Sequence, residues 1–143
     1  MGKSYIGQIY PKMLKSNTFL SLLLFADAVV MIIGSYILRV NGLVPLWLTI
    51  ATYASVVVIV LVAYLVLIGN KKAQLLGFIL GFVAMAVSTN PAHITALKEF
   101  GSTMPLSEAD ITMILGFYLL PVIYIVKYGL SFRTERKAGT TSQ

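Results

Sequence analysis

Long apolar runs separated by short polar stretches dominate this chain, and the first run lies at residues 18–38. It has 21 residues, and Asp27 is its one ionisable side chain. About 20 apolar residues at 1.5 Å each cover the roughly 30 Å of hydrocarbon in a bilayer. The run therefore predicts a transmembrane helix with a carboxyl group near the middle of the membrane.

Three more apolar runs follow, and we predict membrane-spanning helices at residues 45–68, 73–89 and 108–128. Asn41-Gly42 predicts a turn after the first helix, and the polar residues 69–72 predict another. Such short connections place consecutive helices side by side in opposite directions. The pattern predicts an all-α integral membrane protein with a single domain, an antiparallel bundle of four transmembrane helices.

The connection between the third and fourth spans has helical signals of its own. Asn90-Pro91 matches an N-cap followed by proline, and Gly101 fits a helix stop. The apolar residues between them fall near one helix face and are Ile94, Leu97 and Phe100. We predict a short amphipathic helix over residues 91–100 that lies at the membrane interface.

The start of the fourth span carries two acidic residues close together. Pro105 interrupts the chain, and residues 107–110 match a capping box at a helix N-terminus. Glu108 and Asp110 also suit the positive end of the helix dipole. We therefore interpret the two acids as capping residues rather than as a pair of catalytic carboxylates.

The fourth span is interrupted once and is followed by a polar tail. Pro121 removes a backbone hydrogen bond inside the helix, so a kink is expected near Phe117. Residues 133–143 are polar and predict a mobile tail.

Small residues recur along the third span at spacings of four, four, three and four. They are Ala73, Gly77, Gly81, Ala84 and Ser88. This spacing places them on one helix face, and small side chains let helix backbones approach closely inside lipid. We predict a helix-packing face whose partner is the second or fourth span, with a second copy of the protein as the alternative.

Composition agrees with a membrane location. Hydrophobic residues make up 58% of the chain and charged residues 11%, whereas a soluble domain carries about 25% charged residues. The net charge of +6 would suit nucleic acid, but the basic side chains flank the apolar runs. Topology and anionic lipid head groups explain basic residues at such positions, so we expect no nucleic-acid binding.

The distribution of lysine and arginine predicts the orientation in the membrane. Arg39 and Lys98 are the two basic residues expected on one side. The nine expected on the other side are Lys3, Lys12, Lys15, Lys71, Lys72, Lys127, Arg133, Arg136 and Lys137. The positive-inside rule then predicts a multi-pass protein of the cell membrane with both termini in the cytoplasm.

Asp27 is the one residue with a physical argument for function. An ionised carboxylate at the bilayer centre costs roughly 2.5–3.5 kcal/mol or more. One interpretation is a proton or ion site, or a docking point for a basic residue of a partner. The other is a structural carboxyl group that is hydrogen-bonded to a main-chain carbonyl or to a hydroxyl of the second span. The candidate hydroxyls are those of Thr49, Thr52, Tyr53 and Ser55.

Other chemistry finds little support in the residues available. The chain has no cysteine and one histidine, His93, which cannot supply the ligands of a zinc site or of a bis-histidine haem. We therefore expect no metal or cofactor and interpret His93 as a solvent-exposed residue. The sequence contains no phosphate-binding glycine loop and no nucleophile motif, so an autonomous enzyme is not expected.

Two functions fit these features best. The first is an accessory or structural subunit of a larger membrane complex, for example an energy-transducing one, surrounded by other integral membrane subunits and lipid. Little mass outside the membrane and an exposed small-residue face favour it. The alternative is a small homo-oligomeric transporter, or an ion or proton channel, that uses Asp27. In that one feature the chain is similar to the small multidrug resistance transporters, which have Glu in the first helix, but no family is assigned. A third hypothesis, membrane organisation, rests on the interfacial helix.

Overall fold

The structure is a computed structural model that describes residues 3–89 and 91–140, with the side chains of residues 14–89, 91 and 93–134. All regular secondary structure in these ranges is helical, and four stretches are long and apolar enough to cross a membrane. These stretches are Leu14–Val40, Leu46–Leu67, Lys71–Ser88 and Met104–Thr134. The prediction of an all-helical, multi-pass membrane protein is confirmed.

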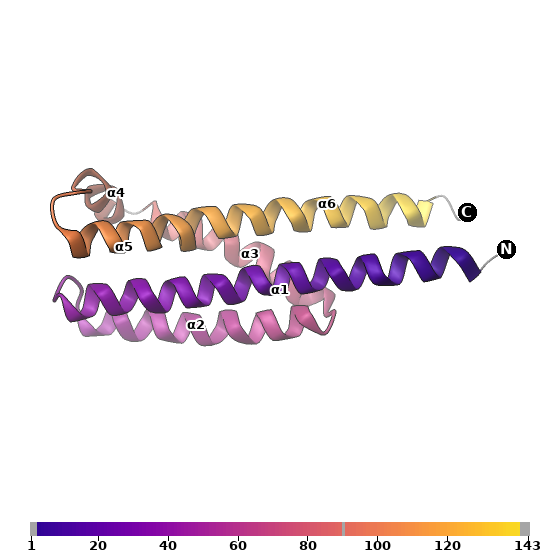
Figure 1. Ribbon diagram of the computed structural model, residues 1–143, viewed down its shortest axis with the longest axis horizontal. Helices are drawn as coiled ribbons and strands as arrows, with labels where there is room; N and C mark the ends of the chain where they lie inside the picture. The colour runs from indigo at the N-terminus through magenta and orange to yellow at the C-terminus, as the bar shows by residue number, and fades with distance from the viewer. Residues whose placement is uncertain (1–2, 90, 141–143) are drawn as a thin grey trace.

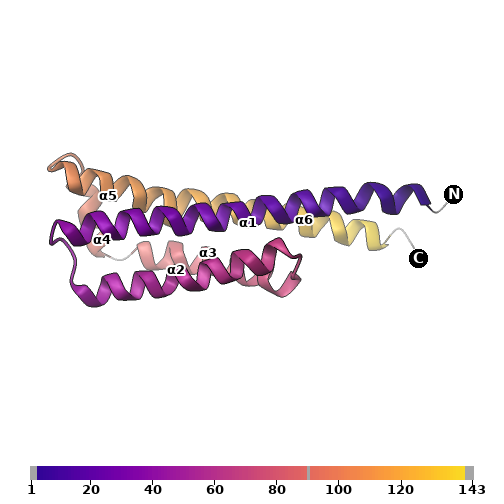
Figure 2. The same ribbon diagram turned by 60° about the horizontal axis from the view of Figure 1, so that its bottom comes forward.

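The helices lie lengthwise beside one another (Figure 1). In chain order they are α1 (Lys3–Val40), α2 (Leu46–Leu67), α3 (Lys71–Ser88), the short α4 (Pro91–Lys98), α5 (Met104–Ile114), the π-helical turn η1 (Leu115–Leu119) and α6 (Leu120–Thr140). The last three form one continuous helix that returns to the end where the chain begins. In Figure 2, α5 lies on one side of α1 and α2 on the other, and α6 crosses α1 toward the C-terminus. It packs against α2, α5 and α6, and α3 packs against α2 and α6.

The turn between α2 and α3 shows how the sequence reverses the chain. Gly69 has φ +86°, in the left-handed region that favours glycine, and the amide of Asn70 donates to the carbonyl of Leu65 at 3.0 Å. The Asn70 side chain then accepts from the amides of Lys72 and Ala73 at 3.0 and 3.1 Å. These bonds satisfy the first free N–H groups of α3, as an N-cap does.

Hydrogen bonds join the helices at the end of the molecule that carries the termini. Four side-chain bonds do so: Ser16 with Ser131 at 2.9 Å, Gln74 to Asn17 at 2.8 Å, Ser21 to the carbonyl of Ala63 at 2.8 Å, and Tyr124 to the carbonyl of Gln74 at 3.1 Å. They connect α1 with α2, α3 and α6, and α3 with α6. We call this set the terminal-end ties.

Two helices extend further than the sequence predicted. α1 begins at Lys3, so the predicted span at residues 18–38 lies within a longer helix. α6 continues to Thr140, so residues 133–140 are helical where a polar tail was predicted. Once a helix exists, each further residue adds a hydrogen bond, and polar sequence alone does not end it. Residues 141–143 lie outside the described part of the chain.

The capping box predicted at residues 107–110 is wrong. α5 begins at Met104, and Pro105 lies in its first turn, where the missing N–H would have no partner in any case. Ser107 is inside the helix, and its hydroxyl donates to the carbonyl of Thr103 at 2.9 Å. The two acids that follow therefore lie beyond the first turn, where they do not cap it.

α4 lies in the connection between α3 and α5, and η1 distorts the last long helix just before Pro121. α4 ends at Lys98, close to the predicted helix over residues 91–100, and the predicted N-cap Asn90 lies outside the described residues. In η1, the amide of Leu120 donates to the carbonyl of Leu115, five residues back instead of four. Pro121 has no N–H, so one carbonyl of the preceding turn loses its usual partner. The distortion expected near Phe117 takes the form of a π turn.

Candidate functional site

Asp27 lies at the middle of the membrane-spanning part of α1, Leu14–Val40. Its side chain is 7% exposed, so the carboxyl group is inside the protein and does not face lipid. It lies against η1: a Cβ atom built on Gly116 would be 3.3 Å from Asp27 Oδ1. The absence of a side chain at Gly116 therefore gives the carboxyl group its room beside the π turn.

The buried Oδ1 atom of Asp27 has no hydrogen-bond partner in the described part of the chain. The bonds predicted from α2 are not formed. Thr52 and Ser55 instead donate to the main-chain carbonyl four residues earlier, at 2.9 and 3.0 Å. Tyr53 is exposed, and the buried hydroxyl of Thr49 has no partner among the described residues. Serine and threonine in helices commonly bond their own helix in this way, which sequence spacing does not reveal.

Asp27 lines a cavity of about 240 Å³ between α1, α2, α3 and the η1–α6 helix. Two hydroxyl groups also line it, those of Ser55 and Tyr124. Ser55 donates to its own helix, and Tyr124 donates to the carbonyl of Gln74 at 3.1 Å. Each hydroxyl has one proton and two lone pairs, so both present only acceptor capacity to the cavity. The wall thus combines a carboxyl group with further acceptors and apolar side chains.

The predicted helix-packing face of α3 lies against α6 of the same chain. A Cβ atom on Gly77 would be 2.5 Å from the Tyr124 hydroxyl, and one on Gly81 would be 3.2 Å from Ile125 Cδ1. Ala73, Gly77, Gly81 and Ser88 are buried and Ala84 is half-buried. Gly77, Gly81 and Ala84 also line the Asp27 cavity. The small residues therefore both bring the helices together and leave space beside the acid.

A second buried carboxyl group, Asp110, was missed as a site residue. Its side chain is 2% exposed, and Oδ2 has no hydrogen-bond partner among the described residues. Thr49 is 5% exposed, and its hydroxyl group also has no hydrogen-bond partner among the described residues. Both residues line a cavity of about 290 Å³ between α1, α2, α4 and α5. Small and apolar residues recur here at spacings of four and three: Ala109, Met113 and Gly116. This spacing could have indicated which face of the helix points into the bundle, and all three residues are buried.

His93 lines this second cavity from α4, and the prediction that it is solvent-exposed is wrong. It is half-buried, and its ring centroid lies 6.0 Å from that of Phe117. α4 folds back against α5, which the amphipathic pattern of the connection did not specify. Glu108 is exposed, whereas Asp110 is buried, so the two acids lie in different surroundings and do not act as a pair.

Among the described residues, no group of three or more His, Cys, Asp or Glu side chains could hold a metal ion. Comparisons with protein-family models, with curated proteins and with solved structures found no match to this chain.

Proposed function

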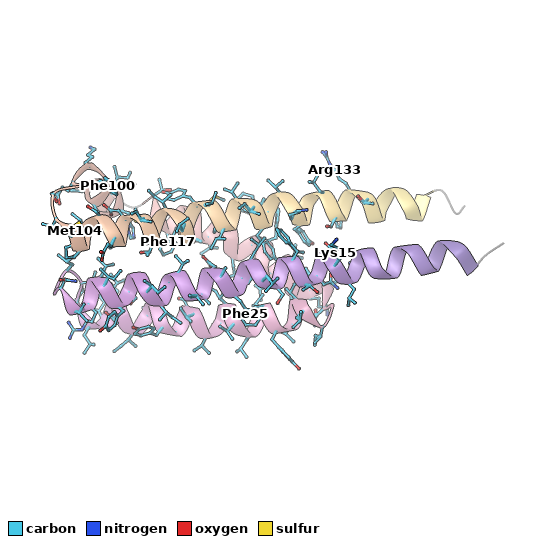
Figure 3. The ribbon with its side chains drawn as sticks, viewed as in Figure 1. Lys15, Phe25, Phe100, Met104, Phe117 and Arg133 are labelled. Atoms are coloured by element: carbon cyan, nitrogen blue, oxygen red, sulfur yellow. The ribbon has the colours of Figure 1, made fainter. Side chains whose placement is uncertain are left out.

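We propose that the chain is an antiparallel four-helix bundle in the cell membrane with both termini in the cytoplasm. Successive long helices run in opposite directions in Figure 1, which supports the bundle. Figure 3 has Lys15 and Arg133 toward the end with the termini and Phe100 and Met104 at the opposite end. The α2–α3 turn, which contains two lysines, lies toward the terminal end as well. The positive-inside rule then favours a cytoplasmic terminal end.

Within this bundle, Asp27 carries a proton or a small monovalent cation across the membrane, as part of a small transporter or channel. The observation that supports this most is the buried Oδ1 atom of Asp27, which has no partner among the described residues and lies at the middle of the apolar stretch of α1. It lies beside a cavity whose two lining hydroxyl groups donate their protons to main-chain carbonyls. A buried carboxyl group without a donor is unfavourable. A proton or a cation supplies the missing positive charge or donor, and ionisable groups inside membrane spans commonly mark such pathways.

The accessory-subunit hypothesis loses one of its supports. It drew on a small-residue face exposed to a partner, and this face packs against α6 of the same chain. A purely structural role also gives no reason for a buried carboxyl atom without a partner. Association with other membrane subunits stays a prediction, which native gel electrophoresis of the protein from its own membranes would test.

The experiment is transport in lipid vesicles that contain the purified full chain. Proton flux is followed with an internal pH dye under a potassium diffusion potential, and cation flux is followed with radiolabelled methylammonium. The test variant is Asp27→Asn, which keeps the shape of the side chain and removes its charge. The matched control is Glu108→Gln, which removes a negative charge from an exposed position.

We expect flux of at least one probe in the wild type and in Glu108→Gln, and loss of that flux in Asp27→Asn. Circular dichroism checks that the variants keep their helix content. Flux that is equal in Asp27→Asn and wild type would remove Asp27 from the pathway. No flux above empty vesicles for either probe would refute the transport proposal and leave the accessory-subunit hypothesis.

A further inference from the structure

We propose that the cavity around Asp110 is a second binding site and that its ligand is a small organic ammonium ion. Two independent observations mark the site: Asp110 Oδ2 and Thr49 Oγ1 are each buried without a hydrogen-bond partner among the described residues. Both side chains are more than nine-tenths buried, and both line the same cavity of about 290 Å³. Buried polar atoms normally have partners, so two unpartnered ones in one cavity indicate a ligand site.

The polar lining of this cavity consists mainly of acceptors. Thr52, Ser55 and Thr112 all line it, and each donates its hydroxyl proton to a carbonyl of its own helix, at 2.9, 3.0 and 2.7 Å. Their remaining lone pairs can only accept. Together with the Asp110 carboxyl group they favour a ligand that is positively charged and carries N–H donors.

The rest of the wall indicates that this cation has an apolar part. Aliphatic side chains line most of it: Val30, Met31, Leu38, Val44, Leu48 and Leu106. A bare metal ion needs close oxygen ligands on all sides, and the described residues hold no cluster of metal-binding side chains. An alkylammonium ion places its N–H groups on the carboxyl group and its carbon atoms against the aliphatic wall, as ligands do in mostly apolar pockets.

The two cavities are neighbours that share part of their walls. Met31, Ser55, Val87 and Phe117 line both. The Asp110 cavity is the one beside α4, at the end away from the termini. Binding at Asp110 does not require transport and does not rest on the proposed function.

Two titratable side chains act on Asp110 from the α4 side. His93 lines the cavity from α4, and Glu99 follows the end of α4. Neither residue forms an ion pair with Asp110 in the described structure, and the carboxyl group keeps its capacity to bind a cation.

Equilibrium dialysis of radiolabelled n-butylammonium against the purified full chain tests the site. The variants are Asp110→Asn, Asp27→Asn and the control Glu108→Gln, which lies on the same helix but is exposed. We expect Asp110→Asn to weaken binding about tenfold, because a charge-assisted hydrogen bond is lost, and Glu108→Gln to bind like the wild type. Asp27→Asn should retain the Asp110 site. Competition with unlabelled 1-butanol and with sodium chloride at matched ionic strength should displace little of the label.

The remaining outcomes distinguish the second site, its ligand class and the transport proposal. Binding that Asp27→Asn abolishes and Asp110→Asn does not change overturns the second site while leaving the proposed function intact. Binding that sodium displaces as well as n-butylammonium overturns the ligand class, and absent binding in the wild type overturns the site. Binding at Asp110 without any flux in vesicles supports the site and refutes the transport proposal. The melting temperature of each variant shows whether lost binding is caused by unfolding. If Asp110→Asn is unfolded, Thr49→Val takes its place, and it should also weaken binding of n-butylammonium.

Discussion

The packing of α3 on α6 makes a sharp prediction for Gly77. A Cβ atom there would be 2.5 Å from the hydroxyl of Tyr124 and 2.7 Å from its Cζ, whereas carbon atoms in contact are normally about 3.5–4.0 Å apart. The Gly77→Ala variant must therefore push the whole ring away, and the Tyr124 hydroxyl would lose its bond to the carbonyl of Gln74. Overpacking costs about 1–3 kcal/mol and a lost hydrogen bond about 0.5–1.5 kcal/mol. We expect Gly77→Ala to lower the free energy of unfolding by about 2–4 kcal/mol.

Two other glycines serve as matched controls. At Gly81 the nearest atom to a new Cβ is the terminal Cδ1 of Ile125, at 3.2 Å, which can rotate away, so Gly81→Ala should cost less than about 1 kcal/mol. Gly129 has no atom within 4 Å of a new Cβ, and Gly129→Ala should be neutral or stabilise the helix by up to about 1 kcal/mol.

The assay is reversible unfolding in mixed detergent micelles as the fraction of denaturing detergent rises, followed by circular dichroism. A Gly77→Ala variant as stable as Gly129→Ala would refute the assigned contact between α3 and α6. Pairing Gly77→Ala with Tyr124→Leu adds a second check. Since the two residues touch, the double variant should lose less stability than the sum of the single variants.

Three further predictions concern a buried hydrogen bond, the space beside Asp27 and the orientation in the membrane. Ser21→Ala should lower the free energy of unfolding by about 0.6–1.7 kcal/mol, because it removes the buried 2.8 Å bond to the carbonyl of Ala63; no change relative to the exposed control Thr18→Ala would contradict this. Gly116→Ala should reduce vesicle flux while costing less than about 1 kcal/mol of stability, because its Cβ would lie 3.3 Å from Asp27 Oδ1 and narrow that site; unchanged flux would count against the geometry of the site. Single cysteines at residues 3 and 140 should both react with impermeant reagents from the cytoplasmic side only, and labelling on opposite sides would overturn the orientation.

The spans could be predicted from sequence because the bilayer fixes their length. The run around Asp27 has the required 20 or so apolar residues whatever its neighbours are. The small-residue face of α3 was also visible, since close helix approach requires Gly77 and Gly81. Its partner was not, because spacing within one helix does not say which other helix lies opposite. The contacts of Gly77 with Tyr124 and of Gly81 with Ile125 identify α6.

Asp110 shows where local reasoning failed. Its position near a proline and beside Glu108 fits a helix start, and a capping role satisfies every local rule. The helix instead begins at Met104, and α1 and α2 pack around the face that carries Asp110. The form of the distortion before Pro121 was equally open, because proline removes a donor and the π turn is one of several ways to accommodate the loss.

The terminal-end ties make the bundle harder to open at the end that carries the termini. Under the proposed transport function, a cation that leaves Asp27 toward the end with the termini has to separate α1 from α2, α3 and α6, where three of these bonds hold α1. Interhelix hydrogen bonds in membranes are worth about 0.6 kcal/mol each on average, so the three bonds of α1 oppose its separation by about 2 kcal/mol. By the relation of tenfold per 1.4 kcal/mol, these bonds alone disfavour the separated arrangement by a factor of about twenty. The bonds therefore favour a bundle that is closed at the end with the termini, and under the proposed transport function a bound cation has to shift that preference.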